Sequence, residues 1–296
     1  MKKAAVLVFA LCLMAGAWAC APAPSNAASA SEPRTSIVSK GSDTMVNLAL
    51  AWAEAYQPAH PEVTLSVTGG GSGTGISALI SGTTDIANAS RAIKPEEMEA
   101  AHANGIEPLE TVVARDAIAI IVHKDNPVSQ LTLQQISDIY TGKLNNWAEL
   151  GGEDRPIVRL SRETNSGTHV YFLETVLRMG DPASTLLFDP RTLLLPSSEG
   201  ITSEVRDNPN AIGYDGLGYV TDEVKILGIS SDATPENYVI PSAETVTDNS
   251  YLISRDLYMY TQNVPTGAIK EYLDWIFSPE AQAIVKELGF VPIHNQ

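Results

Sequence analysis

Four times along this sequence, a short apolar segment of strand character is followed by a turn rich in serine, threonine or glycine, and a helix-like segment comes next. The four turns are residues 40–44, 69–75, 88–91 and 162–168. At the start of a helix the first backbone N–H groups have no partner inside the helix, and the helix dipole adds partial positive charge there. Four such turns in one chain predict several helix N-termini that face a common anion-binding cleft.

The turn at residues 162–168 has the most specific composition. Ser166 and Thr168 supply hydroxyl donors, and Gly167 lets the backbone approach a ligand closely. Arg162 adds a planar guanidinium, which can form two parallel hydrogen bonds with an oxyanion. For this turn alone, an ordinary capped helix beside a surface arginine is the alternative, because serine and threonine are common helix caps.

Strands and helices alternate along the chain, which predicts the α/β class. Strands are expected at residues 37–38, 63–67, 85–87, 117–122, 157–160, 211–214 and 251–260, and the clearest helices at 45–56, 132–140, 169–179, 269–277 and 280–288. A chain of 296 residues is most economically built as two lobes with a cleft between them. In open α/β sheets, ligands bind at the carboxyl ends of the strands.

The first twenty residues predict export. Two lysines precede an unbroken apolar run over residues 4–19, which is short for a membrane span and typical of a signal peptide. Residues 17–19 have the small-x-small form of ordinary signal cleavage, whereas Cys20 directly after them resembles the lipid-modified first residue of a bacterial lipoprotein. An alanine stands where leucine is usual in that lipid-modification motif. Cys12 lies in the segment to be removed, so no disulfide is expected.

The acidic charge balance argues against whole classes of partner. The formal net charge is −16, and cleavage after residue 19 removes two lysines and no acid, which makes it −18. Nucleic acids and anionic membrane surfaces both require basic patches. An anion site on this protein must therefore act through local dipoles and hydrogen-bond donors.

Enzyme and metal motifs are weak in this sequence. The glycine run at 69–75 is not followed by the Gly-Lys-Ser/Thr of a nucleotide-binding P-loop, and it fits the dinucleotide pattern only loosely. No Gly-x-Ser-x-Gly nucleophile motif and no His-Glu-x-x-His pair are present. We expect no catalytic residue, no metal and no cofactor, although carboxylates that pair only in space are invisible in a sequence.

The four turns, in this order and after an export signal, resemble those of the phosphate-binding proteins of bacterial phosphate ABC importers, over roughly residues 36–296. That family has a Gly-x-x-Thr turn, a Gly-Ser turn, an Asp- or Ser-Arg-bearing turn after an Asp-Ile-Ala strand, and an Arg-x-x-x-Ser-Gly-Thr turn. Residues 41–44, 71–72, 85–91 and 162–168 match these motifs. The resemblance implies a two-lobed periplasmic-binding-protein fold. The implied phosphate ligands are Ser42, Asp43, Thr44, Ser72, Gly73, Ser90, Arg91, Arg162, Ser166, Gly167 and Thr168.

The resemblance also implies the organisation and the partners of the chain. The expected segments are a signal peptide at 1–19, a lipid-anchored flexible tether at 20–35, lobe I at 36–113 with 250–296, and lobe II at 114–249. The lobes are expected to open about crossover strands near 112–118 and 245–254. We expect a monomer that binds inorganic phosphate and an ABC permease, binds no nucleic acid, and meets the membrane only through a lipid on Cys20, in the periplasm or on the outer face of the cytoplasmic membrane.

One departure from the family pattern bears on selectivity. Better-known members have an aspartate in the third turn that accepts the proton of hydrogen phosphate, whereas this chain has Ser90 and Arg91. Arg91 is expected either to face the ligand or to pair with Asp85 or another acid. Asp43 is the first candidate for the missing acceptor, unless it only caps its helix. Glu163 is the second, unless it only pairs with the arginine beside it.

Two other functions compete with phosphate delivery. The same fold could bind another oxyanion, such as sulfate, molybdate or tungstate. A secreted phosphatase is the alternative from another class, but it would require a metal or an activated nucleophile, and the sequence motifs supply neither.

Overall fold

The structure is a computed structural model that describes residues 35–293. These residues belong to one compact unit, Arg34–Gln296. The predicted signal peptide, Cys20 and all but the last residue of the predicted tether lie outside the described residues.

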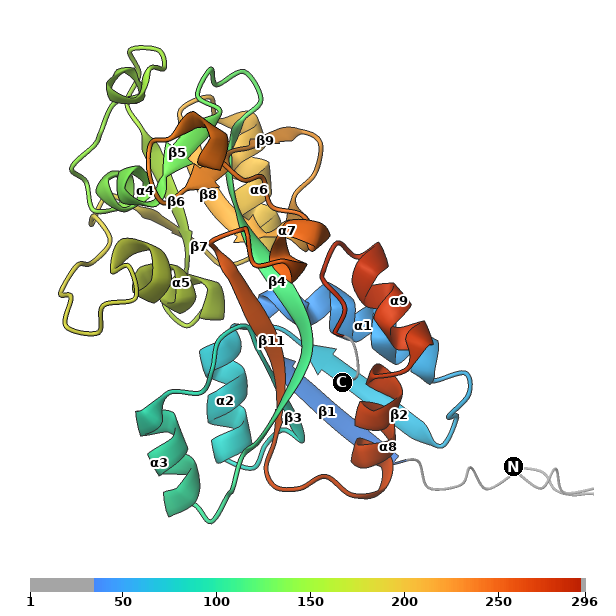
Figure 1. Ribbon diagram of the computed structural model, residues 1–296. Coiled ribbons are helices and arrows are strands. Elements are labelled where there is room, and N and C mark those ends of the chain that lie inside the picture. Colours follow the sequence, from blue (N-terminus) through green and yellow to red (C-terminus); the bar gives the residue numbers. More distant parts are fainter. Residues whose placement is uncertain (1–34, 294–296) are drawn as a thin grey trace, which may run out of the picture. The chain divides into compact units, whose positions relative to one another are not determined.

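The predicted alternation of strands and helices is confirmed (Figure 1). The strands are β1 Thr35–Gly41, β2 Val63–Thr68, β3 Ile86–Ala89, β4 Leu109–His123, β5 Gln130–Thr132, β6 Val158–Arg162, β7 Leu193–Leu195, β8 Ala211–Gly216, β9 Val224–Ile226, β10 Gly228–Ser230 and β11 Ser254–Thr261. The α-helices are α1 Val46–Tyr56, α2 Ser72–Ile80, α3 Pro95–Ala103, α4 Leu133–Tyr140, α5 Gly167–Phe172, α6 Ser198–Asp207, α7 Ala243–Thr247, α8 Gly267–Ile276 and α9 Pro279–Glu287. Shorter helical turns are η1 Asp43–Met45, η2 Trp147–Leu150, η3 Leu173–Leu177, η4 Leu217–Tyr219 and η5 Pro235–Asn237.

One long strand, β4, links two groups of strands. Its residues 109–117 pair antiparallel with β11, and its residues 118–123 pair antiparallel with β8 and β9. The strand order is β2-β1-β3-β11-β4-β8-β6-β7, with β1, β2 and β3 parallel to one another and β6 parallel to β7 and β8. The predicted apolar strand at 117–122 is therefore part of the C-terminal half of β4, where every one of these side chains is buried as expected.

Each group of strands has helices on both faces. On the β1–β3 side, α1, α8 and α9 form one hydrophobic core with the sheet and α2 forms another (Figure 1). On the β6–β8 side, α4 and α5 pack with the sheet in one core and α6 in another. Because the apolar residues of α1 recur at helical spacing, Leu48, Trp52 and Tyr56 all reach the first core.

Two predicted boundaries were wrong. A crossover strand was expected at 245–254, but its first residues belong to α7, and β11 begins only at Ser254. Ser242 and Thr245 form a reciprocal cap at the start of α7. The expected helix at 169–179 is α5 followed by one π-helical turn.

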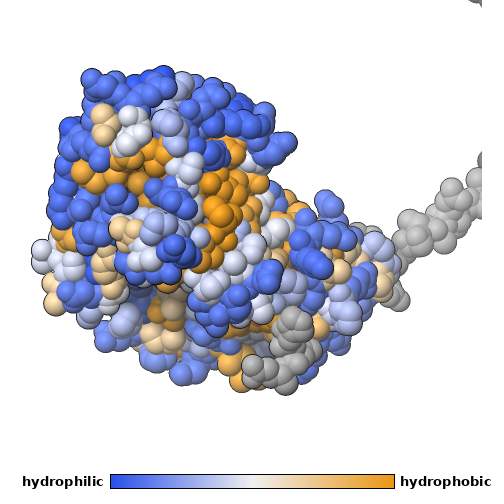
Figure 2. Space-filling model, turned by 45° about the horizontal axis from the view of Figure 1, so that its top comes forward, coloured by the Kyte–Doolittle hydropathy of each residue, from blue (hydrophilic) through white to orange (hydrophobic). Residues whose placement is uncertain are grey.

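The face in Figure 2 is largely hydrophilic, and its hydrophobic residues gather in a few patches. Within residues 35–293, no helix has both the length and the apolar character needed to cross a membrane.

Candidate functional site

Three of the four predicted turns lead directly into helical structure. Ser42 immediately precedes η1, which continues into α1. Ser72 is the first residue of α2, and Ser166 caps α5 by accepting a hydrogen bond from Thr168 N. The turn at 88–91 is followed by a helix as expected, but α3 begins at Pro95, beyond the turn itself. That turn therefore offers its side chains and loop backbone, not the N-terminus of a helix.

The hydroxyl groups of the four turns come together in two buried pairs. Thr44 Oγ1 lies 3.0 Å from Thr168 Oγ1, although the residues are 124 positions apart. Ser72 Oγ lies 3.3 Å from Ser90 Oγ and accepts a hydrogen bond from Ser90 N at 3.0 Å. All four side chains are almost completely buried. The structure therefore brings the predicted hydroxyl donors into one cluster.

Glycine at position 167 allows the first turn of α5 to approach this cluster. A Cβ atom on Gly167 would lie 2.3 Å from Ser72 Oγ and 2.5 Å from Ser90 Oγ, well inside van der Waals contact. Beside it, Gly73 N donates to Asn165 O at 3.1 Å. Two turns separated by about ninety residues of sequence thus meet through backbone atoms.

Arg162 is buried and held from several sides, so a surface arginine is the wrong description. Its side chain is 1% exposed. It donates from Nη1 to Ser198 Oγ at 2.8 Å, and from Nη2 to Asp43 Oδ2 at 2.7 Å and to the Pro196 carbonyl at 2.8 Å. A longer bond of 3.4 Å joins Nε to the Leu195 carbonyl. These four bonds fix the plane of the guanidinium and leave one of its five N–H groups, on Nη1, without a partner among residues 35–293.

Asp43 is a link between turns rather than a helix cap. Its Oδ1 accepts a hydrogen bond from Gly70 N at 2.9 Å, and its Oδ2 forms the ion pair with Arg162. Both carboxylate oxygens are thus engaged by residues outside η1, so the interpretation of Asp43 as only a cap was wrong. Within residues 35–293, Glu163 forms no ion pair with Arg162. The carboxylate that pairs with Arg162 is that of Asp43.

Arg91 is directed toward an acid, the second of the two expected arrangements, and the acid is Glu97 rather than Asp85. Its Nη1 and Nη2 donate to the two Glu97 carboxylate oxygens at 2.8 and 2.7 Å. Burial of Glu97 acts to raise its pKa, but the hydrogen bonds from Arg91 and from Lys94 N outweigh burial and lower it. The Arg91 Nε atom is buried and has no partner among the described residues.

Arg255 is a third buried arginine beside the hydroxyl cluster, and it lies outside the turn motifs. It faces Asp116 across the β11–β4 ladder and forms a buried ion pair with it at 2.9 Å. From the same guanidinium, Nη2 donates to Thr168 Oγ1 at 3.0 Å and to Thr44 Oγ1 at 3.3 Å, and Nη1 donates to the Ser90 carbonyl at 3.0 Å. Its signal in the sequence is a charged residue inside a strand with an otherwise apolar inward face.

Ser198 and Asp215 complete the surroundings of Arg162 and were also not predicted. Ser198, the first residue of α6, accepts from Arg162 and donates to Asp215 Oδ1 at 2.9 Å. Asp215 is completely buried, and burial raises the pKa of its carboxyl to about 6. The only hint in the sequence was the serine-rich turn before α6.

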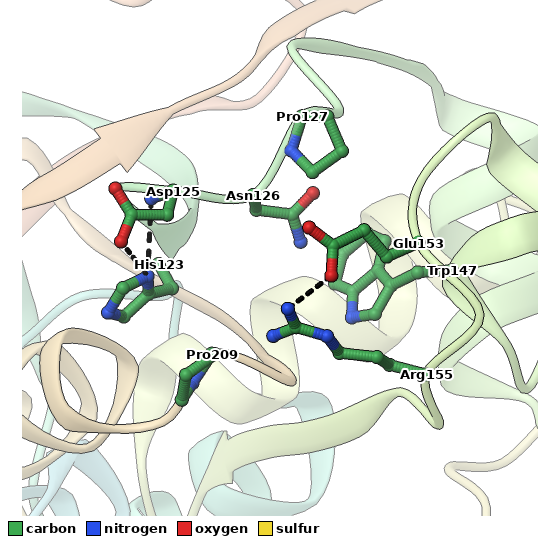
Figure 3. A pocket seen from close by; sticks show the side chains of 8 residues that line it. All are labelled: His123, Asp125, Asn126, Pro127, Trp147, Glu153, Arg155 and Pro209. Atoms are coloured by element: carbon green, nitrogen blue, oxygen red, sulfur yellow. Dashed lines mark hydrogen bonds and ion pairs between the residues drawn. The ribbon is translucent and has the colours of Figure 1, made fainter.

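The pocket in Figure 3 is a separate feature. It is lined by His123, Asp125, Asn126, Pro127, Trp147, Glu153, Arg155 and Pro209, none of which belongs to the predicted site. Arg155 forms an ion pair with Glu153, and His123 Nδ1 lies 3.9 Å from Asp125 Oδ2. The described residues contain no cluster of three or more side chains that could hold a metal ion.

Comparisons with known proteins bear on this geometry. A family model described as a PBP superfamily domain matches residues 26–280. The phosphate-binding protein PstS of Pseudomonas aeruginosa is 32% identical over 272 residues, which cover 86% of this chain and 82% of that protein. PstS of Bacillus subtilis is 33% identical, with 87% of this chain and 81% of the relative covered.

A solved structure from Clostridium perfringens shows the similarity in three dimensions. It is assigned as the substrate-binding protein of a phosphate ABC transporter, was solved with phosphate bound, and is 37% identical with a TM-score of 0.78. The match covers 88% of this chain and all of the other chain. This chain therefore belongs to the PBP superfamily and, within it, to the phosphate-binding proteins of bacterial phosphate ABC importers.

Proposed function

We propose that this protein captures inorganic phosphate outside the cytoplasm and delivers it to the permease of an ABC transporter. The observation that carries the proposal is the convergence of four donor-rich turns on one buried cluster, in a chain 37% identical to a substrate-binding protein with bound phosphate. Relatives at 32–33% identity carry the name phosphate-binding protein, which favours phosphate over sulfate, molybdate or tungstate.

The proposed site compensates for the loss of hydration of the anion. A buried anion without partners is very costly, and hydrogen bonds from N–H and O–H groups to a charged ligand can offset that cost. The proposed ligands are Ser42, Asp43, Thr44, Ser72, Gly73, Ser90, Arg91, Arg162, Ser166, Gly167 and Thr168. Arg91 is the weakest of them, because Glu97 occupies both of its terminal nitrogens. Arg255 joins the set as a proposed support for the threonine pair.

Reversible release follows if the lobes separate. We assign lobe I to residues 36–113 and 250–296 and lobe II to 114–249, with β4 and the segment leading into β11 as the connections. The contacts between them include the ion pair of Arg162 with Asp43 and the hydrogen bond from Asn165 Nδ2 to the Gly70 carbonyl at 2.9 Å, beside apolar contacts such as those of Tyr219 with the core of lobe I. Phosphate would add bonds to both lobes and so favour the closed arrangement, and opening would release it.

The proposed role includes no chemical reaction. The relatives named above are binding proteins of transporters, and capture followed by release requires no catalytic residue and no cofactor. The predicted signal peptide and Cys20 support a protein in the periplasm or tethered by lipid to the outer face of the cytoplasmic membrane, and we propose that it acts as a monomer.

Calorimetric titration with phosphate, sulfate, molybdate and tungstate tests the proposal. Phosphate should bind with the lowest Kd, and a lower Kd for another oxyanion would refute the assignment. Release of p-nitrophenol from p-nitrophenyl phosphate at a rate above the buffer background would instead favour a phosphatase.

A further inference from the structure

A chain of three buried groups runs from the guanidinium of Arg162 into the β6–β8 sheet. Arg162 Nη1 donates to Ser198 Oγ at 2.8 Å, and Ser198 Oγ donates to Asp215 Oδ1 at 2.9 Å. Gly216 N donates to the same carboxylate oxygen at 2.8 Å. Because a hydroxyl has a single hydrogen, the Ser198 hydrogen that points to Asp215 leaves a lone pair toward Arg162.

The burial of the Asp215 carboxylate lowers the stability of the fold. The side chain is completely buried, and its Oδ2 has no hydrogen-bond partner among residues 35–293. Removing a carboxylate from water without full compensation costs stability, and an asparagine of nearly the same shape would lower that cost because it carries no charge. A carboxylate kept under these conditions points to a role other than stability.

The titratable and charged groups around Asp215 come from four elements, β4, β6, β8 and η4; on β8, Tyr214 lies within its electrostatic reach. Burial raises its pKa to about 6, and Asp116 on β4 acts in the same direction. Arg162 on β6 acts in the opposite direction, as do the hydrogen bonds from Gly216 N and Ser198. Tyr219 on η4 also lies within the electrostatic reach of Asp215.

From this geometry, and resting on the phosphate-binding function proposed above, we propose that Asp215 is a positioning residue for phosphate. It holds the Arg162 guanidinium in its binding orientation through the Ser198 hydroxyl, and its ionisation makes phosphate affinity depend on pH. When Asp215 is ionised, it accepts the Ser198 hydrogen and attracts the guanidinium. When it is protonated, it can donate to Ser198 Oγ, so the Ser198 hydrogen turns away from Asp215 and the attraction of the carboxylate for the guanidinium is lost.

The expected direction of the pH effect follows from the raised pKa. Above about pH 6 the folded protein has an ionised Asp215 and an oriented Arg162, and below that pH the carboxyl gains its proton. Asp215→Asn mimics the protonated state at every pH. The variant should therefore differ most from wild type at pH 8 and least at pH 5. Phosphate also changes its own protonation in this range, but the ratio of the two Kd values cancels that contribution.

The experiment is calorimetric titration of wild type and Asp215→Asn with inorganic phosphate from pH 5 to pH 8. We expect Asp215→Asn to raise the Kd roughly tenfold at pH 8, as when a hydrogen bond to a charged group is weakened, and the ratio to approach one at pH 5. Ser198→Ala removes the bridging hydroxyl and should cause a similar loss at pH 8, which keeps the inference testable if Asp215→Asn does not fold. Ser197→Ala is the matched control, because it removes only the cap that accepts from Gly200 N and should leave the Kd unchanged.

The results separate this inference from the function on which it rests. If wild type does not bind phosphate, the proposed function fails, and this inference with it. If wild type binds and the Kd ratio for Asp215→Asn is the same at pH 5 and pH 8, or the variant binds as tightly at pH 8, only the positioning role is overturned. Unchanged affinity of Ser198→Ala would overturn the relay in the same way.

Discussion

Adding a side chain at position 167 is the most direct test of whether the clustered turns form the phosphate site. In Gly167→Ala the new Cβ would lie 2.3 Å from Ser72 Oγ and 2.5 Å from Ser90 Oγ, so the turns must move apart. Overpacking of this kind costs about 1–3 kcal/mol. At about 1.4 kcal/mol for each tenfold, that cost corresponds to a rise in the phosphate Kd of roughly 5- to 150-fold.

The same change should leave the unliganded protein folded. Alanine is a better helix former than glycine, and the proposed lobes can relieve the clash by separating slightly. Thermal melting without phosphate should therefore be unchanged or slightly raised, while the stabilisation by added phosphate is reduced. Gly200→Ala is the control. Gly200 lies in α6, another helix of the same proposed lobe, and its new Cβ would approach no atom outside the adjacent residues and the helix backbone closer than 3.3 Å. A phosphate Kd of Gly167→Ala within twofold of wild type would refute the reasoning.

Three further predictions concern Arg162, Asp43 and Cys20. Arg162→Ala should weaken phosphate binding by at least about 2 kcal/mol in calorimetry, and because the side chain is 1% exposed and holds four hydrogen bonds, it should also lower the melting temperature without ligand; unchanged affinity would remove Arg162 from the site. Asp43→Asn should weaken phosphate binding and strengthen sulfate binding, since an amide can donate to a fully deprotonated oxygen; an unchanged ratio of the two Kd values would exclude a selective role. The intact mass of the native protein should include acyl chains on Cys20, and a soluble mature form without them would contradict the lipid anchor.

The elements that carry the site could be predicted because their signals are local. Alternation of apolar residues identified β2, and the spacing of Leu48, Trp52 and Tyr56 identified α1. The cap formed by Thr132 and Gln135 correctly started α4. Repetition of donor-rich turns then predicted one cluster, and the buried pairs Thr44–Thr168 and Ser72–Ser90 lie in it.

The partners of the charged residues could not be predicted, because they depend on which segments the fold brings together. Arg162 pairs with Asp43 across 119 positions, and Arg255 with Asp116 across 139. Even Arg91, whose acid lies only six positions away, was left with two possible orientations until the start of α3 was known. Asp215 had no signal at all, since a buried and a solvated aspartate look the same in a sequence.

The ion pairs suggest how a strongly acidic protein can bind an anion. Each arginine near the cluster is already matched by one carboxylate: Arg162 by Asp43, Arg255 by Asp116 and Arg91 by Glu97. These pairs carry no net charge together, so they do not create a basic surface that would attract nucleic acid or membrane lipids. What they provide is a set of fixed N–H and O–H dipoles at a buried point, where each hydrogen bond to a charged ligand is worth more than in water. Selection by geometry then replaces attraction by charge, which is the arrangement a protein needs if it must collect one anion from a mixture and later release it.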